Sequence, residues 1–430
     1  MSAPERFDVA VVGGGPAGVA AALAAARAGA HTLLVEREAR LGGNATHALV
    51  HTICGLYLGD RDRPIAVHAG LPARLADALG RAGGAGEAES AGRVFYLPIR
   101  PPVFAGLVQA LCEQTPGLLL RPSTTLVGAR LAESPGQPSI LALEGPGEAC
   151  AETDVVVDTS GDAAAVALGG AATEMTAAEG LQRPSFIVHL DGVAEDGLRG
   201  FARLQLTAGV ARAARHGELP ADCESILLRP EGRAGSAYAT LTLAASGGRP
   251  YSPLDPAYLE ALGARAREQA AAVVDFLRRT RPGFAQVRVA DWPSRVGVRE
   301  TRRVVGRVVM DRDDVLAGKR RDDEVALSAW PIELWDDHRR PRFEHPEGPC
   351  SIPLGALVSR DHPRLGTAGR CLSATHEAHG ALRVIGTALA TGEAIGVAAA
   401  LAADAGIALS DVEAARVRWR IQDDALAGLP

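Results

Sequence analysis

The sequence is poor in aromatic residues and has no clustered cysteines. Phe, Trp and Tyr make up 4% of the 430 residues, and alanine and glycine carry much of the chain. The six cysteines are scattered, and none forms a C-x-x-C pair or another metal-ligand spacing. This argues against a disulfide framework and gives no metal site. We expect a tightly packed core of small side chains in a cytoplasmic protein.

Blocks of one charge sign and long hydrophobic runs are also missing. The formal net charge is −6, from 45 basic and 51 acidic residues, and no basic block suits a nucleic acid. The most apolar late run, Ala394–Ala403, is too short and too rich in alanine to span a bilayer. We therefore expect no nucleic-acid partner and no membrane span. The chain length predicts two domains.

The first 36 residues contain a complete dinucleotide-binding fingerprint. An apolar strand, Phe7–Val12, leads into the glycine-rich run Gly13–Gly18, and an alanine-rich helix follows. A second apolar strand, Thr32–Val35, ends on Glu36. Strand, G-x-G-x-x-G loop, helix, strand and acid stand in the order of a nucleotide-binding βαβ unit. The alternative is an ordinary glycine-rich turn, but it does not account for Glu36 at the end of the second strand.

Each part of the fingerprint has a physical role. Gly13 permits the tight turn, Gly15 lets a pyrophosphate approach the backbone, and Gly18 lets helix and strand pack closely. The helix begins at Pro16 and Ala17, and the free N–H groups of its first turn point toward the phosphates. Glu36 can accept hydrogen bonds from both ribose hydroxyls, which indicates FAD or NAD and argues against NADP.

The loop that follows favours FAD over NAD. Arg37 to Asn44 contains a Gly42-Gly43 pair, which resembles a flavoprotein loop along the flavin half of FAD; a surface turn is the alternative. His47 and His51 are four residues apart and would share a face if this segment were helical. Either could contact the flavin or a substrate, and a polar loop beneath the cofactor is equally consistent. A covalent flavin bond at His47 is not favoured, so we expect non-covalent FAD.

The middle of the chain adds two segments to the predicted cofactor site. Thr124–Leu131 and Ser139–Leu143 are typical of a hairpin, and the backbone near Val127 would hold the adenine edge. Thr153–Thr159 predicts a parallel strand that ends at Gly161-Asp162, where open α/β sheets bind ligands. Asp162 also suits a helix N-cap, and both roles can hold together.

Residues 184–345 lack a fingerprint and form the predicted substrate domain. Arg295 and Arg299 stand on a stretch that could be a strand presenting both side chains to one side. Arginine can clamp a carboxylate in two places. The alternative is a salt-bridged strand at the domain interface, and we favour it because charged side chains form such ion pairs more often than they bind a substrate.

The C-terminal part predicts a second anchor for the cofactor. Gly369-Arg370 precedes a short apolar stretch, and the helix after Gly386 carries a small-residue stripe every four residues, at Ala388, Gly392, Gly396 and Ala400, suited to close packing. The N–H groups near Gly386-Thr387 could point at the flavin. Between them, His376, His379 and Arg383 are candidates for substrate binding and proton transfer. Histidines that only satisfy backbone groups are the alternative.

Four segments together resemble the bacterial FAD-dependent oxidoreductase family. They are GGGPAG through GGNAT, DTSGDAA, RVGVRETRRVVG with DRDDV, and AGRCLSATHEAHGALRV with GEAIG. The resemblance implies a two-domain, glutathione-reductase-like FAD fold that is distantly similar to the succinate dehydrogenase flavoprotein. It implies an α/β, Rossmann-like FAD domain with a parallel central sheet, residues 1–183 and 346–430, interleaved with an α+β substrate domain, residues 184–345. Pro353-Leu354-Gly355, Glu333-Leu334-Trp335 and Ile385-Gly386 depart from the family pattern, so no substrate is transferred.

The predicted function is hydride transfer between a small organic substrate and flavin N5, with reoxidation by oxygen or another acceptor. The alternatives are an NADPH-dependent flavin monooxygenase and a flavin-holding subunit without turnover. Homo-oligomerisation stays open. The candidate catalytic residues are His47, His51, His376, His379, Arg383 and Arg299. The candidate FAD-binding residues are Gly13, Gly15, Pro16, Ala17, Gly18, Glu36, Arg37, Gly43, Asn44, Val127, Gly161, Asp162, Gly369, Arg370, Gly386 and Thr387.

Overall fold

The fold is built on a seven-stranded central sheet. The computed structural model describes residues 5–134, 136–147, 149–198, 200–245, 248–337 and 339–427. The sheet order is β6-β2-β1-β9-β8-β7, with β20 paired to β9. Its parallel strands are β1 (Glu5–Val12), β2 (Thr32–Val35), β6 (Leu118–Arg121), β9 (Cys150–Asp158) and β20 (Leu365–Thr367). The antiparallel strands are β7 (Thr125–Arg130) and β8 (Ser139–Glu144), which confirms the predicted hairpin.

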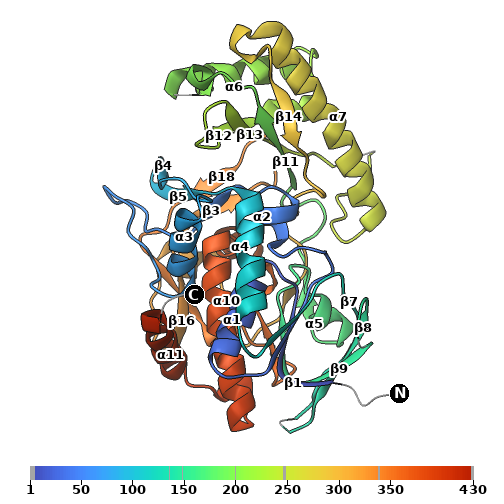
Figure 1. The fold of residues 1–430 in the computed structure, drawn as a ribbon, viewed down its shortest axis with the longest axis vertical. Coiled ribbons are helices and arrows are strands. Elements are labelled where there is room, and N and C mark those ends of the chain that lie inside the picture. The colour runs from blue at the N-terminus through green and yellow to red at the C-terminus, as the bar shows by residue number, and fades with distance from the viewer. Residues whose placement is uncertain are drawn as a thin grey trace.

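Two alanine-rich helices form the core against this sheet. The first, α1 (Pro16–Arg27), lies beside α10 (Ile385–Ala405), with α4 (Pro101–Gln114) next to them (Figure 1). A Cβ added at Gly392 would lie 2.1 Å from the Ala17 carbonyl oxygen, and one at Gly396 would lie 2.2 Å from that of Ala21. The predicted small-residue stripe therefore packs on the first helix, with the backbones in direct contact.

Helix α10 is longer and more deeply buried than its apolar run alone indicated. Ala394–Ala403 is part of a 21-residue helix that is long and apolar enough to cross a membrane by length and composition. However, 89% of its most apolar window is buried inside the protein. Burial between the sheet, α1 and the strands around it accounts for the apolar composition.

Shorter elements surround this core. The remaining helices of the same unit are α2 (Gly43–His47), α3 (Leu71–Arg81), α5 (Ala164–Leu168), α8 (Arg312–Leu316), α9 (His376–Leu382) and α11 (Ala414–Ala427). The small sheets are β3 (Thr52–Cys54) with β5 (Val94–Pro98) and β4 (Glu89–Ala91), β10 (Thr173–Glu174) with β15 (Arg303–Val304), β16 (Glu324–Ser328) with β19 (Cys350–Pro353), and β17 (Ile332–Leu334) with β18 (Arg342–Glu344).

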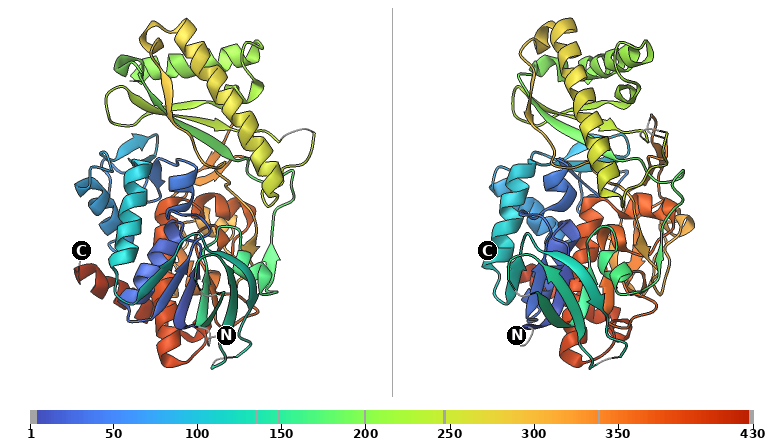
Figure 2. Two further views of the ribbon diagram at one scale, coloured as in Figure 1. Left: turned by 45° about the vertical axis from the view of Figure 1, so that its right-hand side comes forward. Right: turned by 90° about the vertical axis from the view of Figure 1, so that its right-hand side faces the viewer.

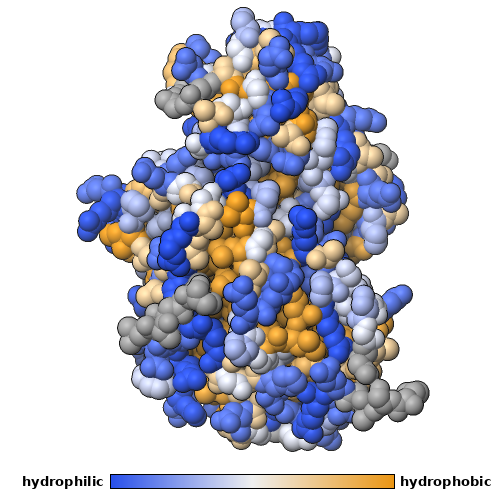
Figure 3. All heavy atoms as spheres, viewed as in Figure 1, coloured by the Kyte–Doolittle hydropathy of each residue, from blue (hydrophilic) through white to orange (hydrophobic). Residues whose placement is uncertain are grey.

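A second unit sits at one end of the molecule (Figures 1 and 2). Its antiparallel sheet has the order β12-β13-β11-β14, from β12 (Leu227–Pro230), β13 (Ser236–Thr242), β11 (Ser185–Asp191) and β14 (Arg288–Asp291). The helices α6 (Gly200–Arg215) and α7 (Pro256–Thr280) pack on it. Figure 3 shows hydrophilic side chains over most of this unit on one face, and apolar atoms gathered in the middle of the larger unit.

The two hydrophobic cores show how the chain is divided between these units. The core of the second unit is drawn from residues 181–298. The core of the larger unit includes Met310, Val315, Ile332 and Leu334. The sequence had placed these four residues in the predicted 184–345 domain. The chain returns to the larger unit soon after Val298.

Two local predictions need correction or refinement. The stretch with Arg295 and Arg299 is not a regular strand; a single bridge joins Gly297 to Ser185. His47 and His51 do not share a helix face, because α2 ends at His47.

Candidate active site

A large cavity runs between the two units. Its volume is about 680 Å³, within the range of ligand pockets, and its lining reaches from the fingerprint loop to the sheet of the second unit. The carboxyl ends of β1 and β9 open into it through Val12, Gly13, Thr159 and Gly161. This is the edge at which parallel α/β sheets bind their ligands.

The fingerprint loop forms one wall and leaves room for a phosphate group. A Cβ added at Gly18 would lie 1.8 Å from the Gly13 carbonyl oxygen, so strand and helix meet there without space for a side chain. At Gly15, by contrast, the nearest atom to an added Cβ is 3.9 Å away. The loop is therefore closed behind Gly18 and open in front of Gly15. Gly15 caps the 12-residue helix α1, whose first N–H groups have no acceptor within the helix.

The cavity end beside β2 suits a ribose and a base. The buried Glu36 lines it and is held by the N–H groups of Gly14, at 2.6 Å to Oε2, and Glu38, at 2.9 Å to Oε1. Thr124, Thr125 and Leu126 line the same end. The sequence predicted that the backbone near Val127 holds the adenine edge; Val127 itself is outside the lining, because alternate residues of β7 face opposite sides and its side chain is 48% exposed.

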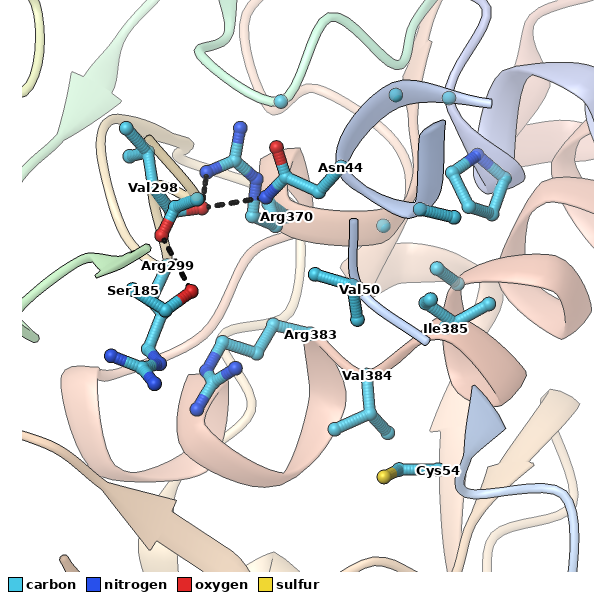
Figure 4. Close-up of a pocket in the computed structure, with 18 of the residues that line it drawn as sticks. Asn44, Val50, Cys54, Ser185, Val298, Arg299, Arg370, Arg383, Val384 and Ile385 are labelled. Atoms are coloured by element: carbon cyan, nitrogen blue, oxygen red, sulfur yellow. Dashed lines mark hydrogen bonds between the residues drawn. The ribbon is translucent and has the colours of Figure 1, made fainter. Parts of the chain in front are cut away.

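Arginine side chains face the fingerprint loop across the cavity. Arg370 lies 3.5 Å from Asp162, and a Cβ at Gly161 would be 2.3 Å from the Arg370 Nη2 atom. Arg370 and Asn44 both donate to the Val298 carbonyl oxygen, which fixes the crossing segment to the larger unit (Figure 4). Arg37 and Arg295 also line this part. The open backbone at Gly15, the helix start, the arginines and Glu36 match the phosphates and ribose of a dinucleotide, so the residues fit FAD.

The rest of the cavity forms a lobe beneath the second unit, which we call the substrate lobe. Its roof is one face of the second sheet, because side chains alternate along each strand. The roof residues are Ser185, Ile187, Leu227, Arg229, Thr240 and Thr242. Its floor and walls are Val50, His51, Thr52, Cys54, Tyr96, Arg299, Trp330, Glu333, Trp335, Arg383, Val384 and Ile385.

Two partly buried arginines lie at the floor and wall of the substrate lobe. Arg299 donates to the Arg183 carbonyl oxygen and stacks 4.6 Å from the Trp335 ring centre. Arg383 donates to the Glu333 carbonyl oxygen at 3.2 Å. Both point into the same region (Figure 4). Burial lowers the pKa of Arg299 to about 9, and the charge of Arg383 contributes. In the described part of the chain, neither guanidinium forms an ion pair.

Glu333 is the carboxylate whose negative charge acts on both arginines, but its two oxygens already accept hydrogen bonds from other side chains. The indole N–H groups of Trp335 and Trp330 donate to it at 2.7 and 2.9 Å. Burial opposes its ionisation, yet the charge of Arg383, the two indoles and Arg299 outweigh burial and lower the pKa of Glu333. With Arg229 in the roof, three arginines face one carboxylate among the lobe residues named above, so the lobe carries a net positive charge.

His51 is the one predicted catalytic histidine that lines the cavity. Its Nδ1 lies 3.2 Å from the Leu49 carbonyl oxygen, which can only accept, so Nδ1 carries the proton. Nε2 has no hydrogen-bond partner among the described residues. Burial lowers the pKa of His51 to about 3, and the charge of Arg229 adds to this effect. A neutral imidazole therefore borders the substrate lobe, with its unpaired acceptor nitrogen buried.

The other three histidines lie outside the cavity lining. His47 contacts Ser294 through Nδ1, at 3.2 Å, and the Arg40 carbonyl oxygen through Nε2, at 2.9 Å. His376 is bound to Glu300, 2.9 Å from Oε2. His379 is fully buried, donates from Nε2 to the Arg370 carbonyl oxygen at 3.1 Å, and has its pKa lowered to about 3 by burial. The structure places these rings as supports of the surrounding segments.

The start of α10 borders the cavity, but through neighbours of the predicted residues. Val384, Ile385 and Ala388 line it. Gly386 is outside the lining because it packs under the chain at β3, where an added Cβ would lie 2.6 Å from the Gly55 carbonyl carbon. Thr387 is buried beside it. Gly18 likewise supports the loop from behind. The lining does include Gly13, Gly15, Pro16, Ala17, Glu36, Arg37, Gly43, Asn44, Gly161, Asp162, Gly369 and Arg370.

Several lining residues had no signal in the sequence. Trp330, Glu333 and Trp335 come from β17 and its flanks, and Arg229 and Thr242 come from the second sheet. No spacing marks Trp330, Arg229 or Thr242, because these residues meet only in the folded chain. Two hints were available: Glu333-Leu334-Trp335 stands where the family pattern is altered, and two of the four tryptophans lie here.

Comparisons with known proteins agree with this geometry. The family model described as FAD dependent oxidoreductase matches residues 8–421. A geranylgeranyl bacteriochlorophyll reductase-like protein of Thermoplasma acidophilum is 14% identical, with a TM-score of 0.50 over 98% of this chain and 84% of that one. The p-nitrophenol 4-monooxygenase of Pseudomonas putida is 12% identical, with a TM-score of 0.49 over 99% and 88% of the two chains. At this identity the first likeness establishes the fold alone.

Proposed function

The chain belongs to the FAD dependent oxidoreductase family, and we propose that it acts on a small organic anion held by Arg299 and Arg383. The carrying observation is that the partly buried guanidinium groups of Arg299 and Arg383 share the substrate lobe with Arg229 and the carboxylate of Glu333. A buried charge without a partner is costly, and a bound anion removes that cost. Carboxylate is the group that fits arginine best, because its two oxygens match the planar fork.

The chain's own residues divide the work between the two parts of the cavity. Gly15, the start of α1, Glu36 and Arg370 would hold FAD, which when bound supplies a two-electron oxidant or reductant. Arg299 and Arg383 orient the anionic group of the substrate, and the second sheet covers it from water. His51 is the candidate base, because its unprotonated Nε2 has no hydrogen-bond partner among the described residues; this atom is buried, so a substrate O–H or N–H group reaches it only after the surrounding lining moves. The substrate's negative charge beside it raises the basicity of the ring.

The experiment compares two arginine variants with a surface control. Arg383→Gln and Arg299→Gln remove one charge each, whereas Arg249→Gln removes an exposed charge of the second unit. Small carboxylic acids and their neutral amides are screened as electron donors by anaerobic bleaching of the flavin absorbance. We expect acids to reduce the flavin and amides not to. Each lobe variant should lower the second-order reduction rate by about 100-fold or more, as expected for loss of a buried charge pair.

The flavin content of each variant distinguishes a loss of substrate binding from a loss of bound FAD. All three variants should retain FAD, because the lobe arginines lie apart from the fingerprint loop. Amides that reduce the wild type as fast as acids, or lobe variants that behave like Arg249→Gln, would contradict an anionic substrate. Oxygen consumption that requires NADPH would instead support the monooxygenase alternative.

A further inference from the structure

Two aromatic rings of the second unit lie in a stack under His51. We propose that Tyr238 is a positioning residue that holds the His51 imidazole at the substrate lobe, with His189 supporting it from behind. The inference rests on the proposed role of His51, but its test is separable from that role.

The three rings form a continuous column. The His51 and Tyr238 rings are stacked, with centres 4.1 Å apart and planes within 9°. The Tyr238 and His189 centres are 4.9 Å apart, with planes at 29°. All three side chains are buried, at 5%, 2% and 6% exposure for His51, Tyr238 and His189. Stacked aromatic rings at these separations attract each other and fix each other's planes.

The column joins the two units. His189 on β11 stands directly opposite Tyr238 on β13, so their places in the stack are set by the register of the second sheet. His51 instead comes from the chain before β3 in the FAD-type unit. Among the residues that the structure describes, the His51 ring forms one hydrogen bond, from Nδ1 to the Leu49 carbonyl oxygen. The Tyr238 face therefore determines the plane of the imidazole and, with it, the direction of Nε2.

Polar contacts hold the far end of the column in place. His189 Nδ1 lies 2.8 Å from Asp291 of β14, and Nε2 lies 2.6 Å from the Ser236 hydroxyl and 3.4 Å from Glu231. Arg233 and Arg100 approach Glu231 at 3.3 and 3.4 Å. These carboxylates outweigh burial and raise the pKa of His189. Charged groups thus anchor His189, whereas His51 at the other end is kept neutral.

The test uses variants that change the stack without touching His51. Tyr238→Phe keeps the ring, and Tyr238→Leu removes the stacking face. The FAD-loaded proteins are labelled with ¹⁵N-histidine, and the His51 ring signals are identified by their loss in His51→Gln. We expect the wild type and Tyr238→Phe to show the Nδ1–H tautomer with no titration down to pH 5. Tyr238→Leu should show mixed tautomers and a titration between pH 5 and 7.

Kinetics provide the second measurement. Flavin reduction should stay within about threefold of wild type in Tyr238→Phe, and should fall at least tenfold in Tyr238→Leu with a new pH dependence. His189→Gln, which leaves Tyr238 in place, should move the His51 signals in the same direction by a smaller amount. This variant replaces Tyr238→Leu in the test if Tyr238→Leu does not fold. Unchanged His51 tautomer and titration in Tyr238→Leu and His189→Gln would overturn the inference. A shifted His51 signal combined with full activity of His51→Gln would sustain it and contradict the proposed role of His51.

Discussion

At the scale of single residues, substitutions at Gly15 and Gly18 of the fingerprint should affect cofactor binding and folding differently. Gly15 adopts an ordinary extended conformation, with φ −69°, and an added Cβ has free space in front of it. We expect Gly15→Ala to lower FAD affinity at least tenfold, because the methyl group occupies the approach of the pyrophosphate. Its stability without FAD should change by about 1 kcal/mol or less. Flavin-to-protein ratio and the unfolding midpoint of the flavin-free protein measure the two effects.

Gly18→Ala is the matched variant at the back of the same loop. There the added Cβ would lie 1.8 Å from the Gly13 carbonyl oxygen and 2.5 Å from the Thr159 hydroxyl, so the backbone must move. We expect a loss of about 3 kcal/mol or more in the free energy of unfolding, with FAD lost as a consequence. If Gly15→Ala binds FAD as tightly as the wild type, the loop does not hold the pyrophosphate.

The predicted cofactor residues reach the cavity mainly where the backbone conformation alone sets their position. Twelve of the sixteen predicted cofactor residues line the cavity, because strand, turn and helix place them relative to each other locally. The histidines fared differently: only His51 of four reaches the lining. Which way a loop side chain points depends on contacts from distant segments, such as Ser294 for His47 and Glu300 for His376, and no local pattern encodes these.

At the scale of elements, the packing of α10 on α1 depends on the absence of side chains. An added Cβ at Gly396 would lie 2.2 Å from the Ala21 carbonyl oxygen. We expect Gly396→Ala to lower the free energy of unfolding by about 1–3 kcal/mol, because the helices must separate. Gly106→Ala on α4 is the control, since no atom lies within 4 Å of its added Cβ. It should raise stability by about 1 kcal/mol through helix propensity alone. Equal effects in urea unfolding would refute the close packing.

Element prediction also failed in a physically understandable place. β2 was bounded correctly, from Thr32 to Val35, because a buried strand shows a continuous apolar run. The segment with Arg295 and Arg299 was expected to be a strand, but it crosses between the units and is held by side chains, including those of Arg370 and Asn44 on the Val298 carbonyl oxygen. Alternating residue types do not distinguish such a crossing from a strand.

At the scale of the whole molecule, the two cores meet around a cavity that neither encloses alone. The larger unit supplies Arg383, Glu333 and the cofactor loop, and the second unit supplies Arg229, Thr242 and the Tyr238 stack. The positive substrate lobe is therefore a property of the assembled chain. This explains why the sequence indicated the cofactor but not the substrate: the FAD fingerprint is one local βαβ unit, whereas the lobe combines residues from eight separate stretches.

The stability of the molecule should depend on the protonation of Glu393, deep in α10. Its side chain is 3% exposed, and Oε1 accepts from the Leu71 N–H at 2.8 Å, with Arg74 at 3.6 Å and Asp424 next to Arg74. Burial raises the pKa of Glu393 from 4.5 to about 7, and the Leu71 and Arg74 contacts offset only part of this rise. A carboxyl whose pKa is raised in the folded state stabilises the fold while protonated, and this contribution is lost as the pH rises from 4.5 through about 7.

Glu393→Gln measures this contribution directly. Glutamine keeps a carbonyl oxygen for the Leu71 N–H and cannot ionise. Relative to the wild type, the variant should gain about 2 kcal/mol in the free energy of unfolding between pH 5.5 and 8.5. The comparison uses urea unfolding of both proteins at the two pH values, so that other titrating groups cancel. If Arg74 instead kept Glu393 ionised, removing the charge would cost more at pH 8.5 than at pH 5.5. A difference of that sign would show that α10 carries a buried ion pair in place of a neutral acid.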